Sequence, residues 1–164
     1  MDSELKKESV FTNKLLGFIF ENVESERVYI HYTHNEEIAH LILDEGFKFT
    51  DSFYKTTQNI HNDLVVLNYK HNLYEHYGEY MIVICIPNDL ADYVKKEINL
   101  SKHNLTVEDY ISKTQQNMEE SYILPSIFVK GYIIYKSEEI IRNPKFKFNY
   151  NVNEFKKLLF TLDK

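Results

Sequence analysis

The sequence predicts a single, mixed α+β domain with a small, partly antiparallel sheet flanked by helices. Its 164 residues are the length of one domain, enough for a sizeable core. The segment 80–86 is apolar on both faces and is followed by Pro87, which is typical of a central strand. Helical and strand-like segments alternate irregularly, with no repeat or linker, and this order favours an α+β arrangement.

Composition and charge exclude several classes of protein. Hydrophobic residues make up 43% and charged residues 27% of the chain, as in ordinary globular proteins. The net charge of −6 argues against a general nucleic-acid binder. The single cysteine, Cys85, allows neither an internal disulfide nor a cysteine-based zinc site. No secretory signal and no membrane-length apolar run are present, so we expect a cytoplasmic protein without a membrane partner.

The chain before the central strand is predicted to begin with a helix and a strand. Apolar residues recur with imperfect helical spacing over 5–21, which predicts a helix or an ordered arm. The short apolar run 28–32 predicts a strand. The polar and aromatic segment 48–62 has no clear period and predicts a long loop. The segment 63–77 is interpreted as a helix in preference to a broken pair of strands.

A capped helix is predicted over 35–43. Asn35 or Thr33 is the candidate N-cap, and two acids in the first turn complement the helix dipole. Gly46 is placed to end the helix. One face of this helix is expected to carry its apolar side chains, namely Ile38, Leu41 and Ile42.

The second half of the chain is predicted to alternate helices with short strands. A helix over 89–97 would be capped by Asn88 or Asp89, and a helix over 106–118 by Thr106. A turn is expected at Pro125, and a strand irregularity at Gly131. Strands are predicted over 121–124, 128–135 and 139–141. An amphipathic helix over 152–162 is expected to close the domain.

His31, at the tip of the predicted strand, is the main candidate for a ligand site. The strand would fix the imidazole, and the start of the next helix would offer free N–H groups. Together with Tyr32 and Thr33, His31 is predicted to line a cleft to which Gly46 and Phe47 return the chain. The alternative is an ordinary half-buried histidine bonded to a neighbouring backbone group.

Other chemistry is less well supported by the sequence. The histidines lack the spacing of a metal pair, and we expect no metal site. No Walker loop, nucleophile elbow or dinucleotide-binding glycine motif is present. Glu119 and Glu120, just before a predicted strand, oppose the dipole at a helix end, so they do not serve helix stability. A carboxylate there could bond a ribose hydroxyl or stabilise an oxocarbenium-like state. The alternative is a solvated helix end.

The order of these motifs resembles the ADP-ribosyltransferase superfamily, in its diphtheria-toxin and poly(ADP-ribose)-polymerase branch. The resemblance covers roughly 28–135, between an N-terminal arm over 1–27 and a C-terminal arm and helix over 136–164. The strand with His31-Tyr-Thr33, the pair Gly46-Phe47, a tyrosine at Tyr54 and the apolar strand 80–87 follow in the family's order. The next matching segment is Glu119-Glu120-Ser121-Tyr122-Ile123-Leu124. Ser121 stands where the family often places its glutamate, and 52–57 lacks the usual glycine.

This resemblance implies a split two-sheet fold that binds NAD as a substrate. It implies that His31 bonds the adenine-side ribose with Thr33 near it, and that Tyr54 stacks on nicotinamide. Glu120 or Glu119 would bond the other ribose and favour the departure of nicotinamide. The leading hypothesis is an NAD-dependent mono-ADP-ribosyltransferase, such as a toxin or effector, that modifies a protein or nucleic acid. The alternatives are a non-catalytic binding protein on a similar scaffold and an unrelated α+β protein.

Overall fold

The computed structural model describes residues 13–21, 26–50, 53–59, 78–103, 105–112, 122–147, 153–154 and 157. The part it describes is an α+β domain with two antiparallel sheets. Every strand pairing in this part is antiparallel, so the mixed pairing allowed by the sequence is not found there. No helix among these residues is long and apolar enough to cross a membrane.

The larger sheet has five strands in the order β3-β1-β4-β6-β7. They are β1 (Glu26–Thr33), β3 (Gln58–Asn59), β4 (Tyr80–Pro87), β6 (Val129–Ile134) and β7 (Glu139–Arg142). Strand β4 is central, as its apolar sequence predicted, and β1 pairs along its whole length, from Glu26 opposite Pro87 to Thr33 opposite Tyr80. Cys85 lies on β4 and is buried.

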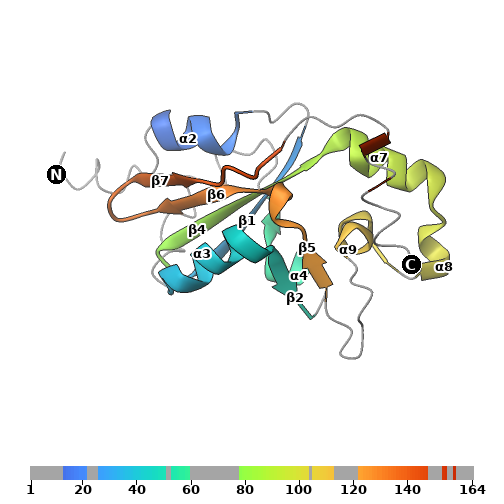
Figure 1. Ribbon diagram of the computed structural model, residues 1–164, viewed down its shortest axis with the longest axis horizontal. Coiled ribbons are helices and arrows are strands. Elements are labelled where there is room, and N and C mark those ends of the chain that lie inside the picture. Colours follow the sequence, from blue (N-terminus) through green and yellow to red (C-terminus); the bar gives the residue numbers. More distant parts are fainter. Residues whose placement is uncertain are drawn as a thin grey trace.

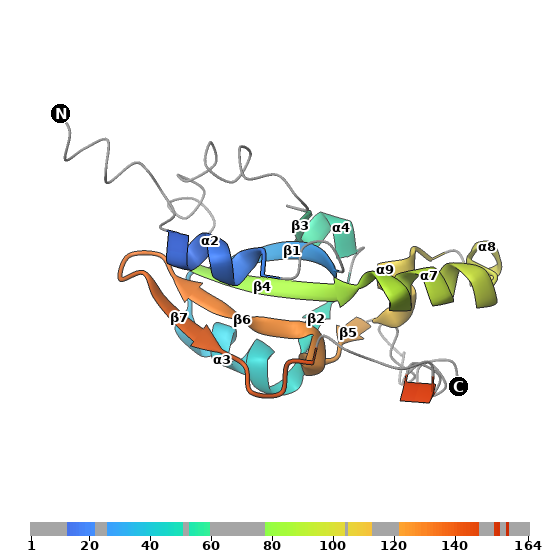
Figure 2. The ribbon, with the colours of Figure 1, turned by 90° about the horizontal axis from the view of Figure 1, so that it is seen from above.

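The two faces of this sheet carry different helices (Figure 1). Helix α2 (Asn13–Ile19) covers one face, where it packs on even-numbered β1 residues such as Val28. Helix α3 (Glu36–Glu45) covers the opposite face, where the larger core lies. Figure 2, turned by 90°, shows that α7 (Asn88–Glu97) continues from the end of β4, with α8 (Leu100–His103) and α9 (Val107–Ile111) beside it.

The smaller sheet pairs β2 (Phe47–Phe49) with β5 (Tyr122–Leu124). Gly46, which ends α3, makes this pairing possible. Its φ of 101° is strained for other residues, and an added Cβ would lie 2.4 Å from the carbonyl oxygen of Leu124. A short 3-10 helix, η1 (Ser126–Phe128), then leads from β5 to β6.

Two helices have the N-caps that their sequences predicted, and a third helix does not. Asn35 caps α3 by accepting from the backbone N–H of Glu37, and Thr106 caps α9 by accepting from that of Asp109. In α7, however, Pro87 holds the N-cap position and no side chain caps the helix. The prediction of Asn88 or Asp89 as the cap was therefore wrong, because the proline that ends β4 leads directly into the helix.

The prediction of a long loop over 48–62 was also wrong for the part of this segment that the structure describes. It completes β2 and then forms α4 (Phe53–Thr56) and β3. These elements are too short to produce a recognisable period in the sequence, and Phe53 is buried in the larger core. The strand predicted over 128–135 spans only 129–134, because Phe128 belongs to η1.

The buried face of α3 differs from the one predicted. The side chains of Ile38 and Leu41 are exposed, at 45% and 52%, whereas Ala39, Ile42 and Leu43 are buried. The helix is thus rotated about its axis relative to the expectation, and it presents two large apolar side chains outward.

Several predicted elements lie partly or wholly outside the described residues. The first helix is described only as α2. The helix predicted over 106–118 is described as α9, which ends at Ile111 with Ser112 as its C-cap, and 113–118 lie outside the described residues. The predicted helix over 63–77 lies outside altogether. Of the last predicted helix, only Asn153, Glu154 and Lys157 are described, and they are helical.

Candidate functional site

A pocket of about 370 Å³ opens beside His31 on the α3 side of the larger sheet. Gly46 and Phe47 line it, so the turn after α3 does return the chain to His31. Thr56 of α4 and Ile123 of β5 also line it. The pocket thus gathers residues from β1, α3, β2, α4 and β5. Its remaining lining residues are Ile38, Leu41, Ile42, Glu45, Lys48, Phe49 and Thr50.

The imidazole of His31 is held from two sides. Its Nδ1 lies 2.7 Å from the carbonyl oxygen of Thr56. The ring centroid lies 4.7 Å from that of Phe47, with a tilt of 54°. Because a carbonyl oxygen can only accept, Nδ1 carries the proton, and Nε2 of the neutral ring is left as an acceptor.

Burial decides the charge state of this histidine. Desolvation lowers the pKa of His31 below its usual value, and the hydrogen bond to Thr56 only partly offsets that effect. At neutral pH His31 is therefore an uncharged group. An imidazole in this state can accept a hydrogen bond from a hydroxyl group of a ligand.

The walls of the pocket are mainly apolar. Three of its lining residues, Ile38, Leu41 and Ile123, are large hydrophobic side chains with exposures of 45%, 52% and 37%. Glu45 and Lys48 add one charge of each sign. An apolar pocket with a few polar groups is typical of a site for a small molecule.

The structure places the other predicted site residues in different environments. Tyr32 packs in the cluster under α2, on the sheet face opposite His31, and does not line the pocket. Thr33 is also absent from the lining; its hydroxyl accepts from the backbone N–H of Asn35. Alternation along β1 explains the separation of His31 from Tyr32. This pocket therefore contains His31 but neither Tyr32 nor Thr33.

Glu119 and Glu120 lie outside the described residues, and so does the side chain of Tyr54. What is described is the strand that follows the two glutamates: β5 begins at Tyr122, pairs with β2, and contributes Ile123 to the pocket wall.

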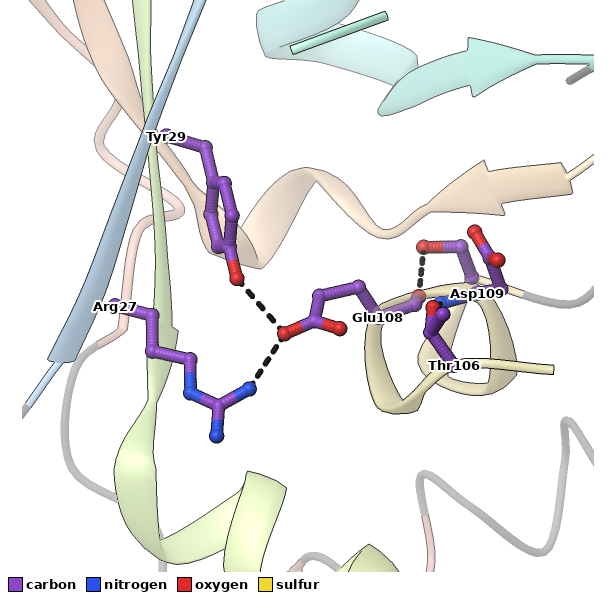
Figure 3. A network of polar contacts seen from close by, with 6 residues as sticks. Arg27, Tyr29, Thr106, Glu108 and Asp109 are labelled. Atoms are coloured by element: carbon purple, nitrogen blue, oxygen red, sulfur yellow. Dashed lines mark hydrogen bonds and ion pairs between the residues drawn. The ribbon is translucent and has the colours of Figure 1, made fainter. Parts of the chain in front are cut away.

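A buried polar network, which the sequence did not predict, lies further along the same face of β1 (Figure 3). Oε1 of Glu108 in α9 lies 2.5 Å from Nη1 of Arg27 and accepts from the hydroxyl of Tyr29 at 2.7 Å. Glu108 is only 1% exposed. Burial lowers the pKa of Arg27, but the hydrogen bond and charge of Glu108 outweigh burial and raise it. The network therefore ties β1 to α9 through a charged pair.

The sequence had suggested only that Glu108 and Asp109 are acids in the first turn of a helix. Both are buried, and both bind groups distant in sequence. Oδ1 of Asp109 accepts from the backbone N–H of Phe53, at the start of α4, at 2.8 Å. In the sequence, the available signal was that two acids follow the helix cap Thr106. This signal did not indicate which groups the acids bind.

A second cluster of buried charged groups lies on the α2 side of the sheet. A register shift between Val83 and Ile84 leaves Lys130 as an extra residue of β6, and its side chain is buried. Its Nζ donates to the carbonyl oxygen of Phe18 and lies 3.2 Å from Oε1 of Glu21. Nearby Glu26 is 1% exposed, and neither of its carboxylate oxygens has a hydrogen-bond partner in the described part of the chain.

The described residues support neither a metal site nor a cysteine nucleophile. No group of three or more His, Cys, Asp or Glu side chains there could hold a metal ion. Burial in the central strand raises the pKa of the Cys85 thiol far above its usual range, so a thiolate nucleophile is not available at neutral pH.

Comparison with known proteins adds no relative to these observations. A scan against protein-family models, a search of curated proteins and a search of solved structures each found no match. A fold class alone does not determine function, so function must be argued from the site. What the structure establishes is an α+β domain with an apolar pocket beside a neutral histidine.

Proposed function

We propose that this protein is an NAD-dependent mono-ADP-ribosyltransferase that uses the pocket beside His31 to bind part of NAD. One observation carries the proposal: His31 and Ile123 line the same pocket, and Ile123 belongs to β5, the strand that begins two residues after Glu120. His31 and the strand that comes soon after the two glutamates in the sequence therefore line one pocket.

The chemistry of the pocket suits one nucleoside part of such a ligand. A volume of about 370 Å³ lies at the lower end of the range for small-molecule sites. The apolar walls can contact an aromatic base, and Nε2 of neutral His31 can accept from a ribose hydroxyl. Lys48 supplies a cation at the pocket for a phosphate group.

The proposed reaction breaks the glycosidic bond between ribose C1′ and the nicotinamide nitrogen. Nicotinamide leaves with the electron pair of that bond, and positive charge develops on the ribose. A carboxylate of Glu120 or Glu119 would stabilise that charge. A nucleophilic atom of the acceptor then bonds to C1′ and loses its proton.

Binding of NAD is the first test. The midpoint of thermal unfolding should rise with millimolar NAD, because a ligand that binds the native state stabilises it. His31→Ala should abolish the rise, whereas His34→Ala should retain it, because His34 is exposed and does not line the pocket. No rise with the unaltered protein would contradict the proposal.

Catalysis is tested separately by the release of nicotinamide from NAD, measured by chromatography. Glu120→Gln or Glu119→Gln should reduce release while leaving the NAD-induced thermal shift in place. If NAD binds and no nicotinamide is released with any acceptor supplied, the alternative holds. The protein is then a non-catalytic binding module, a function that the exposed Ile38 and Leu41 on the pocket wall also favour.

A further inference from the structure

Two adjacent acids of α9 are linked to three alternate residues on one face of β1, namely Arg27, Tyr29 and His31. Glu108 binds Arg27 and Tyr29 directly. Asp109 has no contact with His31, the next residue on that face, but it binds the helix whose carbonyl group holds His31. The link runs from Asp109 to α4 and from α4 to the imidazole.

Helix α4 is a single turn, and its position depends on Phe53. The backbone N–H of Phe53 has no partner within so short a helix, and Asp109 accepts from it at 2.8 Å. The carbonyl oxygen of Phe53 accepts from the hydroxyls of Thr56 and Thr57 at 3.1 and 2.8 Å. The turn is therefore closed on Phe53 and fixed at its start by Asp109.

The ring of Phe53 is completely buried and fixes the same turn against the core. Its centroid lies 4.8 Å from that of Tyr29, edge-on at 89°. Phe47, which also packs on His31, lies 6.0 Å from Phe53. A shift of α4 would therefore disturb both partners of the imidazole, the Thr56 carbonyl and the Phe47 ring.

We propose that Asp109 is a positioning residue for His31: its carboxylate fixes α4, and α4 presents the Thr56 carbonyl that keeps the His31 proton on Nδ1 and the acceptor at Nε2. Asp109 does not line the pocket, so it acts through α4 and not on a ligand. The consequence for NAD binding rests on the proposed function, but the effect on the imidazole does not.

The protonation of His31 can be read directly by nitrogen NMR of the histidine rings, without any ligand. The unaltered protein should show His31 as the Nδ1–H tautomer. In Asp109→Ala the Nδ1–H population should fall, and the pKa of His31 should move towards its usual value as the ring becomes more solvated. Asp109→Asn should retain the Nδ1–H tautomer, because its amide oxygen can still accept from Phe53.

Ser112→Ala is the matched control for loss of stability. Ser112 is buried at the end of α9, and its hydroxyl donates to the carbonyl oxygen of Glu108 at 2.8 Å. This variant loses one hydrogen bond of the same helix but keeps Asp109, so His31 should keep its tautomer. If Asp109→Ala does not fold, Asp109→Ser replaces it, since its shorter side chain cannot span the distance to Phe53.

Failure of this inference and failure of the proposed function are distinguishable. An Nε2–H tautomer in the unaltered protein, or an unchanged His31 tautomer in a folded Asp109→Ala or Asp109→Ser, overturns the positioning role. If the tautomer responds but NAD does not bind the unaltered protein, only the proposed function fails. If both hold, nicotinamide release should fall by about 10- to 100-fold in Asp109→Ala and recover in Asp109→Asn.

Discussion

Arg27 and Glu108 lie 81 positions apart in the chain, yet their side chains approach to 2.5 Å. The side chain of Glu108 is 2% exposed, while that of Arg27 is 22% exposed. The pair therefore joins the beginning of β1 to helix α9, at a place where water screens the charges only in part.

Loss of the Glu108 carboxylate should destabilise the protein. Glu108→Ala should lower the free energy of unfolding by about 2–4 kcal/mol, because Arg27 and the Tyr29 hydroxyl both lose a buried acceptor. Urea unfolding measures the change. In a double-mutant cycle with Arg27→Met, the two effects should couple by about 1 kcal/mol or more. Strictly additive effects would mean that the pair contributes nothing as a pair.

Glu26 should make stability fall as the pH rises. Desolvation, opposed by the charge of Lys130 and reinforced by Glu21, raises the pKa of Glu26 to about 7. The folded state therefore holds a proton that the unfolded state releases above about pH 4.5. The stabilisation is complete below that pH and is lost as the pH rises towards 7.

Glu26→Gln tests this assignment, because an amide keeps the shape of the side chain without the charge. The variant should be more stable than the unaltered protein at pH 8, by about 1–3 kcal/mol. Near pH 4.5 the difference should be small. Urea unfolding at the two pH values gives the comparison, and an equal difference at both would contradict a titrating Glu26.

His31 should impose the opposite pH dependence. Its lowered pKa means that the unfolded state binds a proton more readily, so the stability it contributes is present at neutral pH and is lost as the pH falls below about 6.5. Protonation also converts Nε2 from an acceptor to a donor. On the proposed function, the affinity for NAD, measured by calorimetry, should therefore weaken on acidification. A pH-independent affinity would exclude Nε2 as the acceptor.

Two glycines should respond in opposite directions to the same substitution. Gly46→Ala should destabilise by about 1–3 kcal/mol or more, because Gly46 has a positive φ and its added Cβ would meet the Leu124 backbone. Gly17→Ala should stabilise by about 0.5–1 kcal/mol, since Gly17 lies in α2 with nothing within 4 Å. Thermal unfolding of both variants tests the pair, and a loss in Gly17→Ala would contradict the assigned helix.

Local features of the fold were predictable from the sequence, and non-local ones were not. The run Tyr80–Pro87 is apolar on both faces, which identifies a central strand from the segment alone. Asn35 and Gly46 bound α3 through chemistry within a few residues. In contrast, the exposure of Ile38 and Leu41 depends on how α3 sits against the sheet, which no period in its own sequence records.

In the candidate site, too, local features were predictable from the sequence and non-local ones were not. The return of Gly46 and Phe47 to His31 follows from a short helix and a glycine, and the sequence predicted it. The separation of Tyr32 from His31 follows from the alternation of side chains along a strand, and the prediction that both line one cleft did not take this alternation into account. The roles of Glu108 and Asp109 depend on partners 81 and 56 positions away, so their burial could not be inferred from the helix that carries them.

The reactivity of Cys85 can report how often the larger sheet opens. The protein has one sulfhydryl group, and it is sealed within the central strand of the larger sheet. An alkylating reagent can reach that group only when β4 separates from its neighbours, so the rate of alkylation records how often the middle of the domain comes apart under native conditions.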